Sequence, residues 1–266
     1  MHPFPAEPEA IEGIPFSVSS YFQKLEAPAD LSLALRGGLA SVAGVYGNGI
    51  LQIVGAIILA RLLTPEDFGL MAIIMVLTCF APLLIDFGLG DATAQISKIT
   101  QGQASSLFWL SSGIGLVITL GVAACAPLIA WIYREPRLES FALCFAITFV
   151  LSGISVQHLS LLRRAMQFVV IAKIQILSAL AGYAVAILIA LSGYGYWALV
   201  VRPIVSAACI AIGVWLACRW RPGRPVVDAE VKSMLRFGMH VLGFSITHAM
   251  SLVADRIIMG LFYLPR

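Results

Sequence analysis

Apolar stretches separated by short polar links run from about residue 39 to the end of the chain. A helix that crosses a hydrocarbon core of about 30 Å, at a rise of about 1.5 Å per residue, needs about 20 apolar residues. Seven stretches meet this requirement, at 39–60, 69–90, 107–132, 141–161, 169–192, 198–218 and 237–262. The pattern therefore predicts an all-α polytopic membrane protein with six complete transmembrane helices and a seventh at the C-terminus.

The composition agrees with a membrane environment. Hydrophobic residues make up 60% of the chain and charged residues 12%, against roughly 45–50% and about 25% in soluble domains. These fractions exclude a soluble enzyme, and the net charge of +3 includes no basic stripe that could bind nucleic acid. The five cysteines lie within or beside apolar stretches, without metal-ligand spacing. We therefore expect no metal, no cofactor and no catalytic residue.

The same pattern divides the chain into four parts. Residues 1–34 are rich in Pro and acidic groups and are predicted to form a disordered or interfacial tail. Residues 35–218 hold a lobe of six helices, 219–236 form a basic linker, and 237–266 begin an incomplete second lobe. An offset of 200 residues superposes five identical residues in and just before the first span on the seventh, namely Leu35, Arg36, Gly38, Ile57 and Ile58 on Leu235, Arg236, Gly238, Ile257 and Ile258. Such a repeat predicts two lobes in parallel orientation, one of the plans found in transporters.

The distribution of Lys and Arg predicts the orientation in the membrane, because cytoplasmic loops carry an excess of these residues. With the N-terminus in the cytoplasm, ten basic residues lie on that side and four on the other. The ten are Lys24, Arg36, Lys98, Arg163, Arg164, Arg219, Arg221, Arg224, Lys232 and Arg236, and the four are Arg61, Arg134, Arg137 and Arg266. A cytoplasmic N-terminus is therefore predicted.

Four short motifs carry a resemblance to a known family. They are IILARLLTPEDFGL at 57–70, DFGLG at 86–90, FG at 237–238 and ADRII at 254–258. The first is similar to the first helix and first external turn of the Wzx-type oligosaccharide flippases. Over residues 35–262 the chain resembles the N-terminal half of these lipopolysaccharide and exopolysaccharide flippases, which belong to the superfamily of multidrug, oligosaccharidyl-lipid and polysaccharide exporters.

The resemblance implies transport without covalent chemistry. The expected activity is translocation of an undecaprenyl-pyrophosphate-linked oligosaccharide across the bacterial inner membrane by alternating access, for O-antigen, capsule or exopolysaccharide synthesis. Besides this substrate and the membrane lipids, the expected partners are a second half-transporter or second copy, and polysaccharide polymerase machinery. Three alternatives stay open: a multidrug or metabolite carrier of the same superfamily, a truncated inactive half-transporter, and a membrane enzyme acting on lipid-linked sugars.

A stripe of small and amide residues marks the first span. Ser41, Gly44, Asn48, Gln52 and Gly55 follow one another at spacings of three and four residues, which places them on one helix face. This face is interpreted either as a cavity wall, where Asn48 and Gln52 offer hydrogen bonds to sugar hydroxyls, or as a close helix contact through small residues.

Three basic residues in or beside the spans are candidate ligands for the anionic head of the substrate. Arg61 is predicted at the outer mouth of the first helix, Lys173 inside the inner end of the fifth and Arg202 inside the outer end of the sixth. Arg can bind a pyrophosphate through two parallel hydrogen bonds, whereas Lys acts as a point charge. The alternative is that these side chains snorkel to the headgroups. Asp86 and Asp91 are candidate partners of Lys173 or Arg164.

Two further sets of polar residues have a functional and a structural interpretation. His248 is predicted near the midplane of the seventh helix, where it either couples protons or binds substrate, or bonds to a neighbouring helix. Asp255 and Arg256 follow it as possible coupling or ion-pair residues on different helix faces. The segment Thr64–Asp67 has the residue types of a helix start, with a hydroxyl cap, a Pro and two acids.

Overall fold

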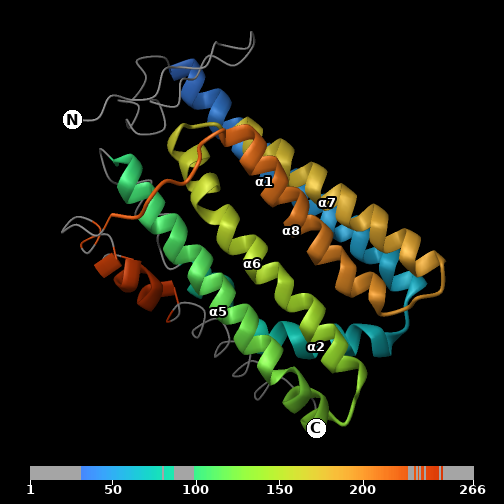
Figure 1. Ribbon diagram of the computed structural model, residues 1–266. Coiled ribbons are helices and arrows are strands. Elements are labelled where there is room, and N and C mark those ends of the chain that lie inside the picture. Colours follow the sequence, from blue (N-terminus) through green and yellow to red (C-terminus); the bar gives the residue numbers. More distant parts are fainter. Residues whose placement is uncertain are drawn as a thin grey trace.

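The computed structural model describes residues 31–79, 81–86, 99–226, 231, 233, 235–236, 238–245 and 247. All the regular structure in this part of the chain is helical (Figure 1). The helices are α1 Leu31–Leu62, α2 Pro65–Thr78, α3 Ala81–Asp86, α5 Gln101–Tyr133, α6 Arg137–Arg164, α7 Phe168–Leu191 and α8 Trp197–Cys218.

Six segments of these helices are long and apolar enough to cross a membrane. They are Gly44–Leu62, Pro65–Asp86, Gln101–Tyr133, Arg137–Arg164, Phe168–Leu191 and Trp197–Cys218. The prediction of six spans in an all-α protein is therefore confirmed. The predicted seventh span at 237–262 lies mostly outside the described residues, of which 238–245 are helical.

The predicted second span, 69–90, differs from the observed helices at both ends. The helix begins at Pro65 because Thr64 and Asp67 form a reciprocal capping box in front of the apolar run. It ends at Thr78, and α3 begins again at Ala81. Pro82 accounts for this break, because proline donates no backbone hydrogen bond and its ring clashes with the carbonyl four residues earlier. Residues 87–90 lie outside the described part.

Helix caps also explain why α5 is longer than its predicted span of 107–132. Thr100 and Gln103 form a second capping box, so that the helix starts at Gln101 within a polar sequence. At the other end the backbone of Arg134 turns left-handed, with φ of 54°, and its N–H reaches the last carbonyls of the helix. Capping therefore decides both ends, and hydrophobicity alone predicts neither.

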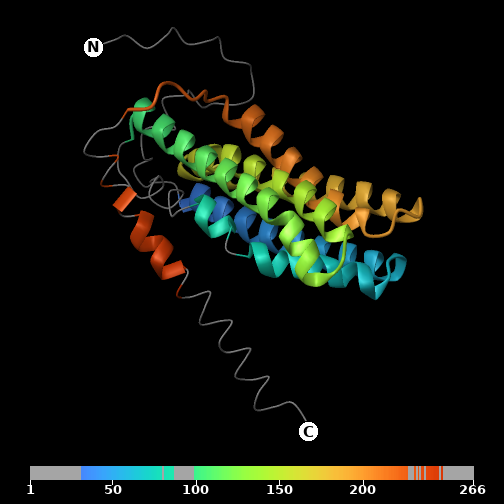
Figure 2. The same cartoon turned by 60° about the horizontal axis from the view of Figure 1, so that its bottom comes forward.

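The helices pack as two groups joined through α6. Helices α5 and α6 form an antiparallel pair, α7 packs between α1 and α8, and α6 also packs on α8 (Figures 1 and 2). Small residues allow the close approach, since a Cβ on Gly115 of α5 would lie 2.7 Å from the Phe149 carbonyl oxygen of α6. Hydroxyl groups add bonds between the helices, as where Thr119 donates to the Ala146 carbonyl oxygen at 2.9 Å.

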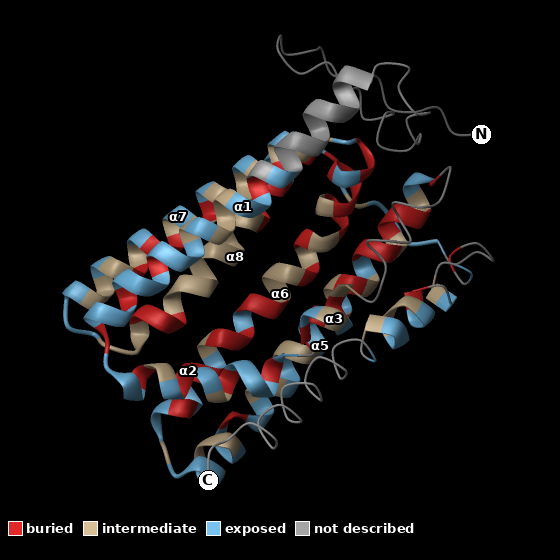
Figure 3. Cartoon of the chain, turned by 180° about the vertical axis from the view of Figure 1, so that it is seen from behind, coloured by how far each residue is buried: buried red, intermediate tan, exposed pale blue. Residues whose placement is uncertain are grey.

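Buried side chains gather in two clusters, which we name after the predicted orientation. The outer cluster surrounds Leu59, Ile74 and Phe141, with members from α1, α2, α3 and α5 to α8. The inner cluster surrounds Phe108 and Trp220 and contains no residue of α1. Figure 3 shows buried residues concentrated along α6, while many residues of α1 and α7 are exposed. Most of these exposed side chains are apolar, as expected for a surface that faces lipid.

Candidate substrate site

The polar stripe predicted on α1 is divided between a helix contact and an exposed face. Gly44 and Gly55 pack against α7, where a Cβ on Gly44 would lie 2.6 Å from Ala172 Cβ and one on Gly55 would overlap the Tyr183 ring. Asn48 is half-buried, and its Oδ1 is buried without a hydrogen-bond partner. The side chain of Gln52 is exposed. The glycines thus make the close contact, while the Asn48 oxygen is buried without a partner and the Gln52 side chain is exposed.

Arg202 of α8 is connected to α1 through a residue of α7, Tyr183. Its guanidinium carbon is 5.0 Å from the centre of the Tyr183 ring, and Nη1 donates a hydrogen bond of 3.2 Å to the Tyr183 hydroxyl. That hydroxyl donates in turn to the backbone oxygen of Gln52, also at 3.2 Å. One buried tyrosine therefore connects the cation of α8 to the backbone of α1 (the helices are labelled in Figure 1). We call Arg202, Tyr183 and Gln52 the three-helix junction.

The charge of Arg202 has no counter-ion within the described part of the chain. The ion pair found there joins Arg137 to Glu135 at an exposed turn, at 3.5 Å. Arg202 is half-buried inside a membrane-spanning helix, and a guanidinium carries five N–H donors, of which the phenol of Tyr183 satisfies one. A desolvated cation with free donors can bind a phosphate through two parallel hydrogen bonds. The junction therefore has the chemistry of an anion site.

Tyr183 was not among the residues singled out from the sequence. A usable signal existed, because a short link between antiparallel helices places residues at equal distances from the link side by side. Tyr183 lies eight residues before the end of α7 and Arg202 five residues after the start of α8, so both lie within about two turns of the link. The role of Gly55 depends on a residue of another helix, and the sequence offers no comparable signal for it.

Lys173 lies on a different side of α7 from Tyr183. It is exposed, and it shares an exposed stripe with Leu177, Leu180 and Leu188 at helical spacing. Tyr183, by contrast, is buried against α1 and α8. The structure does not bring Lys173 and Arg202 together, and an exposed apolar stripe favours the snorkelling interpretation of Lys173.

The remaining predicted residues fall at helix ends or outside the described residues. Arg61 is exposed in the last turn of α1, just before the capping box of α2. In that box Asp67 accepts from the Thr64 backbone N–H at 3.0 Å and from its hydroxyl at 2.9 Å, which confirms the predicted helix start. Asp86 is the half-buried last residue of α3. The structure does not describe Asp91, His248, Asp255 and Arg256.

The inner cluster contains buried polar groups that the sequence reading did not consider. The imidazole of His158 is fully buried and stacks on the Trp215 ring with centroids 4.5 Å apart. The Phe108 and Trp220 rings contact it edge-on. Neither amide atom of the buried Gln157 has a hydrogen-bond partner. The aromatic enclosure leaves His158 no route to a ligand, so its place is that of a core residue.

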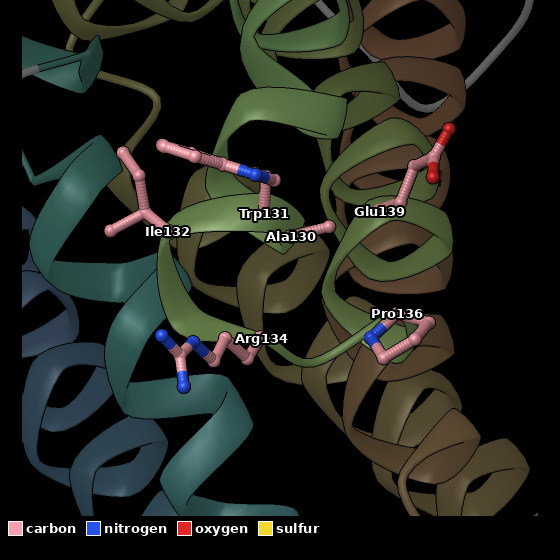
Figure 4. A pocket seen from close by; sticks show the side chains of 6 residues that line it. All are labelled: Ala130, Trp131, Ile132, Arg134, Pro136 and Glu139. Carbon is pink, nitrogen blue, oxygen red and sulfur yellow. The ribbon is translucent and has the colours of Figure 1, made fainter.

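Two hollows on the surface lie away from the predicted site residues. One, of about 620 Å³, lies at the turn between α5 and α6 and is lined by Ala130, Trp131, Ile132, Arg134, Pro136 and Glu139 (Figure 4). The other, of about 440 Å³, is an apolar groove lined by Leu84, Trp109, Leu110, Gly113, Ile114, Val117 and Ile118. An exposed Trp beside an Arg is typical of a membrane–water interface. We therefore attribute the first hollow to the position of this turn at the membrane surface and not to ligand binding.

Six apolar helices joined by short turns define a polytopic helical membrane protein in the described part of the chain. Comparison with known proteins makes this specific. The chain belongs to the polysaccharide biosynthesis protein family, whose model matches residues 58–266. The predicted resemblance is therefore confirmed at the level of the family.

Three relatives show how much of a longer protein the chain matches. The lipopolysaccharide biosynthesis protein WzxC of Escherichia coli is 26% identical over 80% of this chain, and the succinoglycan biosynthesis transport protein ExoT of Rhizobium meliloti is 27% identical over 83%. The teichuronic acid biosynthesis protein TuaB of Bacillus subtilis is 26% identical over 80%. In each case the match covers 44% of the relative, so the chain spans somewhat less than half of their length. No solved structure matches the chain.

Proposed function

We propose that this chain forms one lobe of a carrier that moves a lipid-linked oligosaccharide across the bacterial inner membrane. The substrate would be an oligosaccharide on undecaprenyl pyrophosphate, and the mechanism alternating access between this lobe and a second one. The second lobe would come from a further half-transporter, from more of the same polypeptide or from a second copy. The family, with relatives named for polysaccharide biosynthesis and transport, supports this class of cargo.

The observation that carries the proposal is the unpaired cation of the three-helix junction. An Arg202 held in place by Tyr183, without a carboxylate beside it in the described part of the chain, would bind the pyrophosphate of the carrier lipid. Asn48 and Gln52, on the adjoining helix, would offer hydrogen bonds to the first sugar. Arg61 lies at the end of the same helix and would meet the substrate at the outer mouth.

The same observation bears on the alternatives. A multidrug carrier for cations would need an acidic site, whereas the described charge inside the junction is positive. A membrane enzyme acting on lipid-linked sugars would need a sizeable loop to carry its reactive groups. The turns between α1 and α2, α5 and α6, and α7 and α8 are Leu63–Thr64, Arg134–Pro136 and Ser192–Tyr196. These short turns favour transport.

The test is Arg202→Ala in the natural gene, expressed in a bacterium that lacks its own flippase. Because the variant loses the cation that binds pyrophosphate, we expect export of polysaccharide to fall about tenfold or more, while the protein remains inserted. Lipid-linked saccharide should accumulate on the cytoplasmic side. Arg137→Ala, which removes an exposed arginine of the same charge, is the matched control and should export normally. Full export by the Arg202 variant would disprove the pyrophosphate role.

We further propose that the N-terminus and the segment after α8 face the cytoplasm, as the distribution of basic residues predicts. A single Cys introduced at Arg224, in a variant without the native cysteines, should react with an impermeant maleimide after the membrane is permeabilised. A Cys at Arg134 should react in intact spheroplasts. Labelling in the reverse order would invert the proposed topology.

A further inference from the structure

The segment that follows α8 is bound to the first turns of α5. We call residues 220–226 the strap; it crosses from the end of α8 to the beginning of α5 (Figure 2). The Trp220 indole N–H donates to Gln101 Oε1 at 2.7 Å, and Gln101 Nε2 donates to the Arg221 carbonyl oxygen at 2.9 Å. Trp220 itself is buried in the inner cluster. The strap thus begins with a buried anchor and a reciprocal pair of hydrogen bonds.

Further bonds fix the rest of the strap. Ser105 Oγ accepts from the Gly223 backbone N–H at 2.9 Å, and the Trp109 indole N–H donates to the Gly223 carbonyl oxygen at 3.1 Å. Ser106 Oγ accepts from the Val226 backbone N–H at 2.7 Å and donates to its carbonyl oxygen at 2.6 Å. Pro222 and Pro225 further restrict the backbone of the strap.

This fixed backbone presents basic side chains at the end of the helix bundle. Arg219, Arg221 and Arg224 are all exposed. Arg219 directly follows the last residue of α8, and its backbone is left-handed, with φ of 48°. The Arg221 guanidinium carbon lies 5.6 Å from the centre of the Trp215 ring, so that this side chain is also held in place. We call these three residues the arginine cluster.

The surroundings of the cluster are poor in acidic residues. Helices α5, α7 and α8 and residues 219–226 contain no Asp or Glu, and the single acid of α6, Glu139, lies in its first turn at the opposite end. Asp228 and Glu230 follow the strap in the sequence, outside the described residues. Arg163, in the last turn of α6, adds another exposed cation at this end. Within these described segments, the end of the bundle that carries the cluster therefore has no acidic side chain to neutralise it.

We propose that the strap is a preorganised binding surface for the anionic headgroups of phospholipids in the adjoining membrane leaflet. The cluster follows directly on a span that ends at Cys218, which places it at headgroup depth. Several arginines held at fixed spacing bind phosphate groups of neighbouring lipids without the entropic cost of ordering a flexible linker. A basic segment that was merely solvated would not need its backbone hydrogen-bonded at three of seven residues, Arg221, Gly223 and Val226. The proposal is independent of the transported substrate.

The experiment measures which lipids the purified whole chain retains. The chain is exchanged into nanodiscs of equal parts phosphatidylglycerol and phosphatidylcholine, extracted in mild detergent, and its bound lipids are counted by native mass spectrometry. We expect several-fold enrichment of phosphatidylglycerol. Arg221→Gln with Arg224→Gln should abolish this enrichment, because each arginine near the surface contributes about fivefold. Arg134→Gln with Arg137→Gln, at the other end of the bundle, is the matched control and should leave it unchanged.

A second variant separates preorganisation from charge. Gln101→Leu with Ser106→Ala removes bonds of the strap but keeps every arginine, and we expect the enrichment to fall several-fold. Release of the strap is checked with Gly102→Cys and Val226→Cys, which should form a disulfide only when the strap is docked, since a Cβ on Gly102 would lie 3.2 Å from Val226 Cβ. Gly113→Cys with Val226→Cys serves as the distant control pair.

Each outcome decides the proposal. Unchanged enrichment in the arginine variant, or an equal loss in the control at the other end, would overturn it. Unchanged enrichment in a variant whose strap is shown to be released would also overturn it, because arginines on an undocked segment would then bind phosphatidylglycerol equally well. Displacement of phosphatidylglycerol by millimolar inorganic phosphate would assign the cluster to free phosphate. Retained enrichment in phosphate, with loss in both variants, supports the lipid surface.

Discussion

The three-helix junction and the strap differ in how completely their polar groups are hydrogen-bonded. At the strap, the indole N–H groups of Trp109 and Trp220, the Gln101 amide and two serine hydroxyls all have hydrogen-bond partners. At the junction, Arg202 has one neutral partner and the nearby Asn48 Oδ1 has none. Satisfied polar groups stabilise a fold, whereas buried polar groups without partners cost free energy unless a ligand satisfies them. The unsatisfied groups at the junction are consistent with the proposed binding of an anionic ligand there, whereas the satisfied groups at the strap order its backbone.

Removing the anchor of the strap should have the largest effect on stability. Trp220→Ala deletes a side chain that is 1% exposed, which typically costs about 3–5 kcal/mol of the free energy of unfolding. Unfolding in detergent, followed by circular dichroism against denaturant, measures the loss. Trp131→Ala is the control, since Trp131 is 76% exposed and should change stability little. Equal stability of the two variants would mean that the strap contributes little to the fold.

Filling the close contact at the junction should have the next largest effect. Gly55→Leu places side-chain atoms where the Tyr183 ring lies, and overpacking of this kind costs about 1–3 kcal/mol. The same unfolding experiment measures it, and export should fail as well because α1 is pushed away from α7. Gly49→Leu is the matched control, because nothing lies within 4 Å of a Cβ at Gly49. A Gly55 variant as stable as the Gly49 variant would contradict the packing of Tyr183 against α1.

The smallest expected change in stability comes from a single hydroxyl. Tyr183→Phe keeps the ring under Arg202 but removes the hydrogen bonds to Arg202 and to Gln52, and such bonds contribute about 0.5–1.5 kcal/mol each. We expect a modest loss of stability and a clear loss of export, because Arg202 is no longer held in position. Tyr194→Phe, at an exposed position of the turn between α7 and α8, is the control. Normal export by the Tyr183 variant would show that Arg202 needs no positioning by the hydroxyl.

The spans could be predicted because the bilayer imposes one simple condition on the sequence. A segment of about 20 apolar residues must form a helix there, since no water is present to satisfy its backbone. The predicted helix boundaries were wrong where another effect competed with hydrophobicity. The capping boxes at Thr64 and Thr100 extended helices into polar sequence, and Pro82 follows the break in the second span. These local signals can be recognised in the sequence. The sequence does not show how strong each signal is relative to the apolar pattern.

The site was predictable only in part. Arg202, Asn48 and Gln52 stood out as polar residues within apolar spans, and the structure places them on α8 and α1, which Tyr183 of α7 connects. Lys173 stood out for the same reason, yet the structure places it on an exposed stripe away from Arg202. Depth in the membrane follows from position along the helix, whereas the direction of a side chain depends on which neighbours pack against that helix.

The sequence by itself determined the environment, the number of described spans and the family, because each depends on local composition or on short motifs. The tertiary structure decided which polar residues share a site. It placed Tyr183 beneath Arg202, allowed by the missing side chain of Gly55, and it turned the first part of the predicted basic linker into a strap fixed to α5. Both outcomes depend on contacts between residues far apart in the chain, and a pattern of apolar and polar positions along one helix contains no information about which residue of another helix it will meet.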